Sequence, residues 1–591
     1  MSFLDQLSSA ERAVLESYMR PVQFLRGERI LHQGDPGDGC YLIDQGEVRL
    51  ELEDFETDSD SVLGYVSAGE FLGEFSLLDG APRSADAFAH SDVQARWLAS
   101  AEFDRLCEHE PCLALVFSKA LGRNMSEKLR FYTGKISEFL FADDVDAATN
   151  AMVQRAAEAQ AAFQDWPEPR VDALLRALAE TVAGQAEALA QACVAETKMG
   201  CAPDKVIKIR RAALDVLSTL EGRTACGTLD VDVERAITEI AAPMGVVFGL
   251  APLTNPVATV IFKTLVCLKS RNALIYSCHH GALGVGGRTG ALIQGVLAQH
   301  GAPVNLVQWV AERTSRRKSM MLMKHRGIAF ILATGGPSLV RAAYSSGTPA
   351  IGVGAGNAPV LVCADADPQA AAEMVIAGKS FDNGMICASE NNLVVEAAAL
   401  PGLLEALPAH GAAVLSGEEK ARFLTCVLDA GGHLQRAMIG QSAQWIAGQA
   451  GVERPYPIRL IVVPGGLDEL DGPLGREKMA PLVSLFTVSG AEQGLVVCRR
   501  ILDNEGRGHT AVIHTHDPAL IERYGQLMPA SRILANVSAT VGAIGGGTGL
   551  APTMTLGCGT FGGNSTTDNV TFRHLYNVKR LAQPLSGPPV S

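Results

Sequence analysis

A cysteine in a small, mostly neutral stretch is the first residue whose setting suits covalent chemistry. Cys387 lies in Phe381-Asp-Asn-Gly-Met-Ile-Cys-Ala-Ser-Glu390, directly after a turn-forming Asp-Asn-Gly. A thiolate attacks carbonyl carbon, and a loop or the start of a helix favours the ionised form of a thiol. The alternative is a small buried apolar residue, the usual role of a lone cysteine in an intracellular chain. The residues that accompany Cys387 therefore decide between the two interpretations.

A second segment that could bind a ligand is Gly69-Glu-Phe-Leu-Gly-Glu-Phe-Ser-Leu-Leu-Asp-Gly-Ala-Pro-Arg-Ser-Ala85. A glycine followed by a short helix offers free backbone N–H groups to an anion. Arg83 can fold back onto a phosphate as a charge-assisted pair, and Glu74 can accept hydrogen bonds from sugar hydroxyls. The alternative is that Glu74 and Arg83 only form an ion pair on the surface.

This segment resembles the phosphate-binding cassette of cyclic-nucleotide-binding domains, as in the bacterial cyclic AMP receptor and kinase regulatory subunits. Gly34-Asp-Pro-Gly-Asp-Gly-Cys-Tyr-Leu-Ile-Asp-Gln-Gly-Glu-Val48 also resembles a strand–turn–strand of that family. The residues that the resemblance places at the nucleotide are Gly73 and Glu74 on the ribose side and Arg83 and Ser84 at the cyclic phosphate. Because Arg-Ser-Ala resembles the bacterial receptor, cyclic AMP is the expected effector, with cyclic GMP or no ligand left open.

Short strands separated by glycine turns must position these residues. Near-alternating runs occur at residues 22–25, 29–32, 40–44 and 47–51. Strands this short at this spacing predict a small β-barrel or jelly roll, followed by helices, over residues 1–130. Residues 131–148 have apolar side chains at helical spacing and are expected to form a helical connector.

In the second half of the chain, strand-like apolar runs alternate with helical segments. The predicted strands are residues 244–250, 273–277, 304–310 and 328–333, and the predicted helices include 257–268 and 290–298. This alternation predicts a parallel sheet with helices on both faces, and therefore an α/β, Rossmann-like fold with its ligands at the carboxyl ends of the strands. Thr334-Gly-Gly-Pro opens a helix after a strand, which is a weak phosphate signal because an ordinary tight turn has the same sequence.

A series of motifs in this half resembles the CoA-acylating aldehyde dehydrogenases, particularly the aldehyde dehydrogenase half of the bifunctional aldehyde–alcohol dehydrogenases. The motifs include Pro252-Leu-Thr-Asn-Pro256, Leu332-Ala-Thr-Gly-Gly-Pro337, Gly352-Val-Gly-Ala-Gly-Asn357, the segment around Cys387, Glu477-Lys-Met-Ala-Pro481 and Leu556-Gly-Cys-Gly-Thr-Phe561. The resemblance spans about residues 195–583. It implies an NAD-binding part at 149–365, a catalytic thiol subdomain at 366–545, and a C-terminal segment, 546–591, that returns to the dehydrogenase body.

The resemblance also implies roles for individual residues. Cys387 would be the nucleophile, Asn255 an oxyanion donor, and His279 an aid to proton transfer or a contact of coenzyme A, with His509 a weaker candidate. The expected NAD-binding residues are Ser277, Gly335, Gly336 and Glu477. Hydrolytic members of the family have a lysine at the Ser277 position, so NADP remains open.

The absence of one side chain points to the acyl acceptor. Hydrolytic members activate water with a glutamate in a segment that aligns with Gly352-Val-Gly-Ala-Gly356, and no carboxylate occurs between Ile351 and Val362. Without that base water is a poor acceptor, so coenzyme A is expected to take the acyl group. Acetaldehyde is the default substrate, and other small aldehydes such as sulfoacetaldehyde remain open.

Composition limits the remaining classes. The 591-residue chain is too long for one core, and its formal net charge of −14 argues against nucleic-acid binding. Its 13 cysteines lack metal-like pairs, and no long uncharged apolar stretch occurs. We therefore expect a cytoplasmic protein with reduced thiols and no metal or membrane partner, and a homodimer or higher homo-oligomer. Because the sequence ends at Ser591, the iron-dependent alcohol dehydrogenase half is expected to be missing.

Three hypotheses follow for the whole chain. The leading one is an acylating aldehyde dehydrogenase regulated by a cyclic nucleotide, and a variant of it has an N-terminal barrel that serves only as an assembly module. The second is a non-enzymatic cyclic-nucleotide sensor, against which the intact Cys387, Asn255 and Glu477 argue. The third is a transcription factor, which the acidic charge and the lack of a basic helix-turn-helix make a poor fit.

Overall fold

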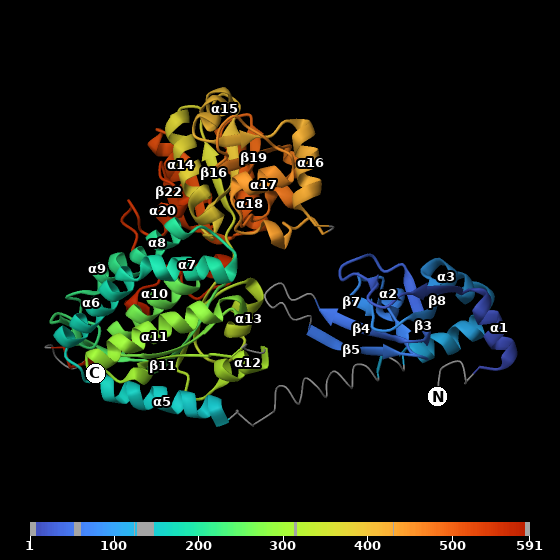
Figure 1. Cartoon of the computed structure of the whole chain (residues 1–591), viewed down its shortest axis with the longest axis horizontal. Coiled ribbons are helices and arrows are strands. Elements are labelled where there is room, and N and C mark those ends of the chain that lie inside the picture. Colours follow the sequence, from blue (N-terminus) through green and yellow to red (C-terminus); the bar gives the residue numbers. More distant parts are fainter. Residues whose placement is uncertain are drawn as a thin grey trace. The chain divides into compact units, whose positions relative to one another are not determined.

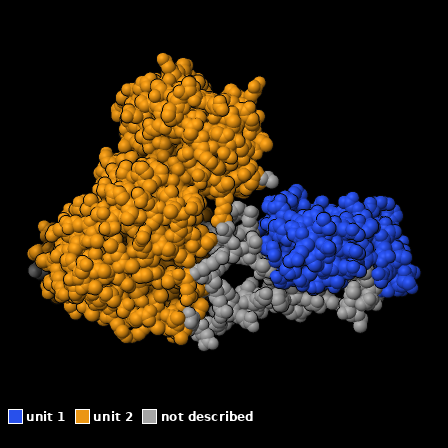
Figure 2. All heavy atoms as spheres, in the orientation of Figure 1, with its two compact units in different colours: residues 1–144 blue, residues 145–591 orange. Residues whose placement is uncertain are grey.

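The computed structural model describes residues 7–52, 61–122, 125–126, 147–312, 316–429 and 431–585. It divides into two compact units, Met1–Asp144 and Val145–Ser591 (Figures 1 and 2). Most of the predicted connector at residues 131–148 lies outside the described residues, and only its last two residues are seen, at the start of a helix.

Unit 1 consists of two four-stranded sheets with short helices beside them. Their strand orders are β1-β8-β3-β6 and β2-β7-β4-β5, and all of the pairs are antiparallel. The elements are α1 Ser9–Ser17, β1 Arg20–Phe24, β2 Arg29–Leu31, β3 Gly39–Gln45, β4 Glu47–Leu52, β5 Ser61–Ser67, β6 Phe71–Leu72, α2 Glu74–Asp79, β7 Asp86–Ala89, β8 Val93–Ala99 and α3 Ser100–His109. The β-rich fold predicted for this part is confirmed.

Unit 2 begins with a group of helices around a five-stranded parallel sheet of order β13-β12-β11-β14-β15. The helices before this sheet are α5 Ala147–Phe163, α6 Glu168–Gly184, α7 Ala186–Thr197, α8 Ala202–Arg210, the π-helical turn η2 Arg211–Asp215 and α9 Val216–Leu220. The sheet and its helices are β11 Val246–Ala251, α10 Pro256–Lys269, β12 Ala273–Cys278, α11 Leu283–Gln299, β13 Val307–Trp309, α12 Arg316–Lys324, β14 Phe330–Thr334, α13 Pro337–Tyr344 and β15 Ala350–Val353. Helices α10 and α11 pack on one face of the sheet and α5 on the other (Figure 1).

The predicted α/β fold is confirmed, with one local difference. The apolar run at residues 304–310 is not one strand. It begins with a 3-10 turn, η4 Val304–Leu306, because the N–H of Leu306 donates to the carbonyl oxygen of Pro303 at 3.1 Å. Only β13 pairs with the sheet.

A seven-stranded parallel sheet forms the second half of unit 2, with strand order β18-β19-β20-β17-β16-β21-β22. Its elements are β16 Ala358–Val362, α14 Pro368–Ser380, η5 Phe381–Gly384, β17 Glu390–Glu396, α15 Leu400–Ala409, β18 Ala412–Val414, α16 Gly417–Val427, α17 Ala443–Gln449, β19 Leu460–Gly465, β20 Leu482–Val488, α18 Ala491–Asn504, β21 Gly508–His514, α19 Pro518–Leu527, β22 Ala530–Ala535 and α20 Ala539–Ala543. Helices cover both faces, so strands such as β16 and β21 are buried along their whole length.

The C-terminal strand returns to the first half of unit 2. Strand β23 Tyr576–Ala582 pairs antiparallel with β10 Ile237–Pro243, which pairs with β9 Gly227–Asp232. Searching the described part of the chain for a helix that is both long and apolar enough to cross a membrane finds none.

Candidate active site

Cys387 lies in the loop between η5 and β17, under a glycine-rich turn. Its side chain is partly buried and packs with Ile386 against an apolar cluster that includes Ala388 and Ile544. A Cβ added to Gly356 would overlap the carbonyl oxygen of Cys387. The turn of residues 352–357 therefore crosses directly over the thiol segment, and only glycine permits that approach.

The thiol of Cys387 is protonated in this arrangement. Burial raises its pKa to about 12, the negative charges of Glu477 and Cys558 act in the same direction, and Arg532 opposes them. The expectation that the loop itself would favour the thiolate is wrong here, because lost hydration outweighs what the loop supplies. A proton acceptor is needed before this thiol can attack.

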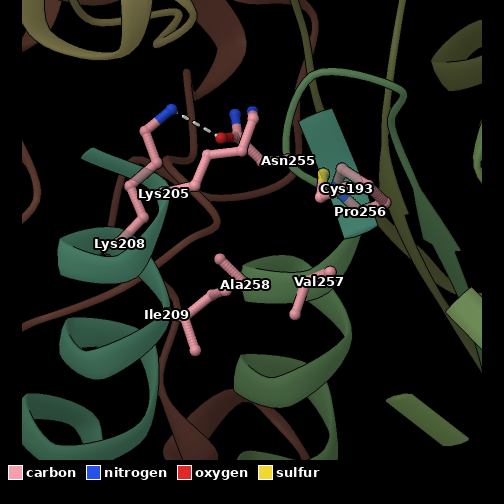
Figure 3. Close-up of a pocket in the computed structure, with 8 residues that line it drawn as sticks. All are labelled: Cys193, Lys205, Lys208, Ile209, Asn255, Pro256, Val257 and Ala258. Carbon is pink, nitrogen blue, oxygen red and sulfur yellow. Dashed lines mark hydrogen bonds between the residues drawn. The ribbon is translucent and has the colours of Figure 1, made fainter. Parts of the chain in front are cut away.

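Asn255, for which the resemblance implies the role of oxyanion donor, lies beside the thiol segment. It is the N-cap residue of α10, and its Nδ2 donates to the carbonyl oxygen of Met385 at 3.1 Å. Its Oδ1 accepts from Nζ of Lys208 at 2.7 Å, the dashed contact in Figure 3. Because an ammonium group can only donate, Lys208 fixes the amide with its NH2 group towards the thiol loop.

A small pocket lies beside Asn255, between the second half of α8 and the first turn of α10. Residues lining it are Cys193, Lys205, Lys208, Ile209, Asn255, Pro256, Val257 and Ala258 (Figure 3). In Figure 3, Lys205 and Lys208 project from α8, and the segment that starts at Asn255 enters α10. This pocket places α8 at the edge of the site.

Asp382 ties the thiol loop to α8, a connection that the sequence analysis missed. The side chain is fully buried, and its Oδ2 accepts from Nζ of Lys205 at 3.0 Å and from Nζ of Lys208 at 2.5 Å. Oδ1 accepts from the backbone N–H of Cys201 at 2.8 Å. Breaking one partner of a buried ion pair costs about 3–5 kcal/mol, so these contacts hold the loop in place. The only sequence signal was the i, i+3 spacing of the two lysines.

His509 lies beside the glycine-rich turn that crosses the thiol segment. It is fully buried, its Nδ1 lies 2.9 Å from Oγ1 of Thr510, and its ring lies 3.3 Å from the position of a Cβ on Gly356. Its Nε2 has no hydrogen-bond partner among the described residues. Burial and the charge of Arg532 hold the pKa of His509 well below its usual value. The imidazole is therefore neutral.

Glu477 also belongs to this group. Burial and the charge of Glu505 raise its pKa to about 8, and the charge of Lys379 acts in the opposite direction. The backbone N–H of Glu477 donates to Oε2 of Glu505 at 2.5 Å. The charge of this carboxyl group raises the pKa of the Cys387 thiol, so the two groups are electrostatic neighbours.

The other proposed coenzyme residues lie at the carboxyl edge of the five-stranded sheet. Ser277 is the penultimate residue of β12, and Gly335 and Gly336 follow β14, with Gly336 as the N-cap of α13. Oγ1 of Thr334 is buried there without a hydrogen-bond partner in the described part of the chain. An orphaned polar atom at the strand ends of an open parallel sheet fits a dinucleotide site.

His279 lies at the same edge, immediately after β12. Its Nδ1 accepts from the backbone N–H of Gly281 at 3.1 Å, and its ring lies 4.1 Å from that of His280. A Cβ on Gly281 would lie 3.1 Å from Leu253, so this turn touches the loop that leads to Asn255. The structure thus groups His279 with Ser277 at the strand ends.

In unit 1, Arg83 is buried and its guanidinium is already paired. Nη1 donates to the carbonyl oxygens of Gly39 at 2.8 Å and Gly73 at 2.9 Å, and Nη2 donates to Oδ1 of Asp38 at 2.7 Å. Glu74 is buried at the start of α2, and Ser84 is exposed. The alternative of a surface pair between Glu74 and Arg83 is therefore wrong.

Comparisons with known proteins match both units. Residues 135–550 match the sequence model of the aldehyde dehydrogenase family, and residues 21–110 match that of the cyclic nucleotide-binding domain. These matches confirm both resemblances found in the sequence.

Individual relatives agree with the family matches. The chain is 37% identical over 442 residues to the bifunctional aldehyde-alcohol dehydrogenase AdhE of Escherichia coli K12, covering 74% of this chain and 49% of that protein. It is 35% identical over 437 residues to the succinate-semialdehyde dehydrogenase (acetylating) of Clostridium kluyveri, covering 74% of this chain and 96% of that one. The solved acetylating aldehyde dehydrogenase of Geobacillus thermoglucosidasius superposes with a TM-score of 0.72 at 36% identity. The match covers 75% of this chain and 98% of that chain. The chain thus spans about half the length of the bifunctional relatives.

Proposed function

The chain belongs to the aldehyde dehydrogenase family, and from that premise we propose that it oxidises a small aldehyde and transfers the acyl group to coenzyme A. One observation carries the proposal. The turn over Cys387 consists of residues 352–357 and contains no carboxylate. In such a site the turn supplies no carboxylate that could activate water against the acyl group on sulfur.

The residues around Cys387 have complementary roles in this reaction. Attack of the sulfur on the carbonyl carbon forms a thiohemiacetal, whose oxyanion requires hydrogen-bond donors. The Nδ2 group of Asn255 and the backbone N–H of Cys387 are those donors. Because the pKa of Cys387 is about 12, the thiol proton must first move, and Nε2 of the neutral His509 is the acceptor that we assign.

The coenzyme residues fit a nicotinamide dinucleotide, which supplies a hydride acceptor when bound. Ser277, Gly335 and Gly336 would hold it at the sheet edge, and Glu477 would bind its nicotinamide ribose. Ser277 stands where hydrolytic members of the family have a lysine, so the proposal includes both NAD and NADP as the coenzyme. His279, at the same edge, would contact coenzyme A or assist proton transfer.

Acetaldehyde is the default substrate of the proposed enzyme. A second class is aldehydes that carry a negative charge, since a relative of nearly the same length as unit 2 is named for succinate semialdehyde. Sulfoacetaldehyde belongs to the same class. We also propose a homo-oligomer, because Val231, Val233 and Leu581 are exposed on or beside the sheet β23-β10-β9.

Product analysis tests the proposed reaction. With aldehyde, NAD and coenzyme A, the products are expected to be acyl-CoA and NADH in equal amounts, with little free acid, because no carboxylate in the turn can activate water. Chromatography of the acyl products alongside NADH absorbance checks this. Free acid as the main product, formed equally fast without coenzyme A, would refute the acylating function.

We further propose that unit 1 binds cyclic AMP and changes the rate of the dehydrogenase. A bound phosphate would take the place of the Asp38 carboxylate on Arg83, while Gly73 offers backbone amides and Glu74 faces the ribose. A ligand shifts a rate only when it binds two arrangements of the protein with different affinity. The alternative is an assembly module with no ligand.

Calorimetric titration with cyclic AMP and cyclic GMP tests this site. Arg83→Ala is expected to abolish binding, and Arg83→Lys to weaken it at least tenfold, because lysine keeps the charge but cannot form a bidentate pair. Arg105→Ala, which removes an exposed arginine of α3 paired with Glu102, is the control and should bind normally. If neither nucleotide binds the wild type at micromolar concentration, the assembly module is the better account. If one binds without changing the rate, the regulatory claim fails.

A further inference from the structure

Arg211 begins a π-helical turn on the helix that borders the active site. The turn, η2, joins α8 to α9, and such turns are rare and occur frequently at functional sites. Arg211 follows Lys208 by three residues, or about 4.5 Å along the helix axis. It therefore lies about one turn beyond the lysine that contacts Asn255 and Met385.

The guanidinium of Arg211 lies against a loop that we call the glycine loop, residues 545–549, with the sequence Gly-Gly-Gly-Thr-Gly. A Cβ on Gly546 would lie 2.5 Å from Nη1 and 2.8 Å from Nη2 of Arg211. The preceding residue, Ile544, belongs to the apolar cluster against which Ile386 and Cys387 pack. Arg211 thus connects α8 to a loop that directly follows a residue of this cluster.

The cations of this helix differ in how they are neutralised. Lys205 and Lys208 are almost fully buried, and both form ion pairs with Asp382. Arg210 forms a pair with Glu187 at 2.7 Å. Among the described residues, Arg211 has only a longer pair, 3.6 Å from its Nε to Oδ2 of Asp215, and its side chain is 31% exposed. Its charge is therefore accessible and only weakly compensated.

The glycine loop packs directly on the guanidinium at Gly546 and is open next to that contact, because a Cβ on Gly547 or Gly549 would meet no atom within 4 Å. Four of its five residues are glycine, so apart from Thr548 no side chain of the loop occupies the volume in front of the guanidinium. A planar guanidinium binds the oxygens of a carboxylate or sulfonate through two parallel hydrogen bonds.

We infer that Arg211 and the glycine loop form a subsite for the anionic end of the substrate, so that the enzyme prefers short aldehydes with a carboxylate or sulfonate. The inference rests on the proposed function, because it assigns Arg211 to the substrate of that reaction. Arg211 is thereby a specificity-determining residue and takes no part in bond making at Cys387.

The test compares charged and uncharged aldehydes in the full-length protein. Values of kcat/KM are measured with succinate semialdehyde and sulfoacetaldehyde, and with acetaldehyde and butyraldehyde, at saturating NAD and coenzyme A. Arg211→Gln is expected to lower kcat/KM for the charged aldehydes roughly 10- to 100-fold, the scale of one hydrogen bond to a charged group. The uncharged aldehydes should change less than about threefold. Arg210→Gln, which removes the neighbouring cation, is the matched control and should leave both classes unchanged.

Several outcomes would overturn the inference. An equal loss for charged and uncharged aldehydes would make Arg211 structural. A higher KM for coenzyme A with every aldehyde would assign Arg211 to a phosphate of coenzyme A. If the wild type turned over no aldehyde, the proposed function would fail, and binding of 2-hydroxyethanesulfonate and succinate, measured by ligand-observed NMR, would decide the subsite. Binding that Arg211→Gln removes supports the subsite, and binding that is absent or unchanged in the variant contradicts it.

Discussion

Replacing Cys387 with alanine is expected to abolish acyl-CoA formation while leaving NAD binding nearly unchanged. The sulfur carries the covalent intermediate, and the neighbouring thiol, Cys558, is buried. The side chain is only partly buried, so its loss should disturb packing little. The measurements are steady-state NADH formation with aldehyde and coenzyme A, and fluorescence titration with NAD.

Cys426→Ala is the matched control for this variant, because Cys426 is also partly buried but lies on α16, away from the thiol loop. It should retain full activity. Turnover by Cys387→Ala above the background rate would remove Cys387 from the role of nucleophile.

Replacing Asn255 with alanine is expected to lower kcat by roughly a hundredfold or more, the usual effect of losing one oxyanion donor. The fold should tolerate the change, because Lys208 keeps its contacts with Asp382 and the carbonyl oxygen of Met385. KM for the aldehyde should change much less than kcat, since the donor acts on charge that develops during the reaction.

Asn255→Asp is a stricter version of the same test. It keeps the size and the acceptor for Lys208 but removes the N–H donor, so kcat should fall about as far as in the alanine variant. A normal kcat in either variant would mean that the loop at Asn255 does not face the reacting carbonyl.

The elements that position the site could be predicted from local sequence. The apolar run of β11, the Asn-Pro that begins α10 and the run of β12 follow each other at a spacing that only a strand–helix–strand unit explains. Asn255 was assigned from its place in the Pro252-Leu-Thr-Asn-Pro256 motif, and the structure puts it at the N-cap position of α10.

Contacts between distant parts of the chain could not be predicted. Asp382 and Lys208 are 174 residues apart, and nothing local distinguishes their buried pair from two surface charges. The close approach of Gly356 to Cys387 likewise depends on how two loops cross in space. Burial by such contacts raises the pKa of Cys387, whereas its own sequence suggests the opposite.

The same limit applied to Arg83 and Arg211. The sequence indicated that Arg83 could fold back on a phosphate, but its pairing with Asp38, Gly39 and Gly73 depends on strands that meet only in the folded unit. Arg211 gave no signal, because its partner loop lies more than 300 residues further along the chain.

The most direct test of the account is the mass of the intact protein after reaction with aldehyde and NAD in the absence of coenzyme A. We expect one equivalent of NADH and a mass increase equal to one acyl group, located on the peptide that contains Cys387. Addition of coenzyme A should remove this acyl group and release acyl-CoA. An unmodified protein that continues to form NADH and free acid without coenzyme A would contradict the central claim that the acyl group passes from Cys387 to coenzyme A.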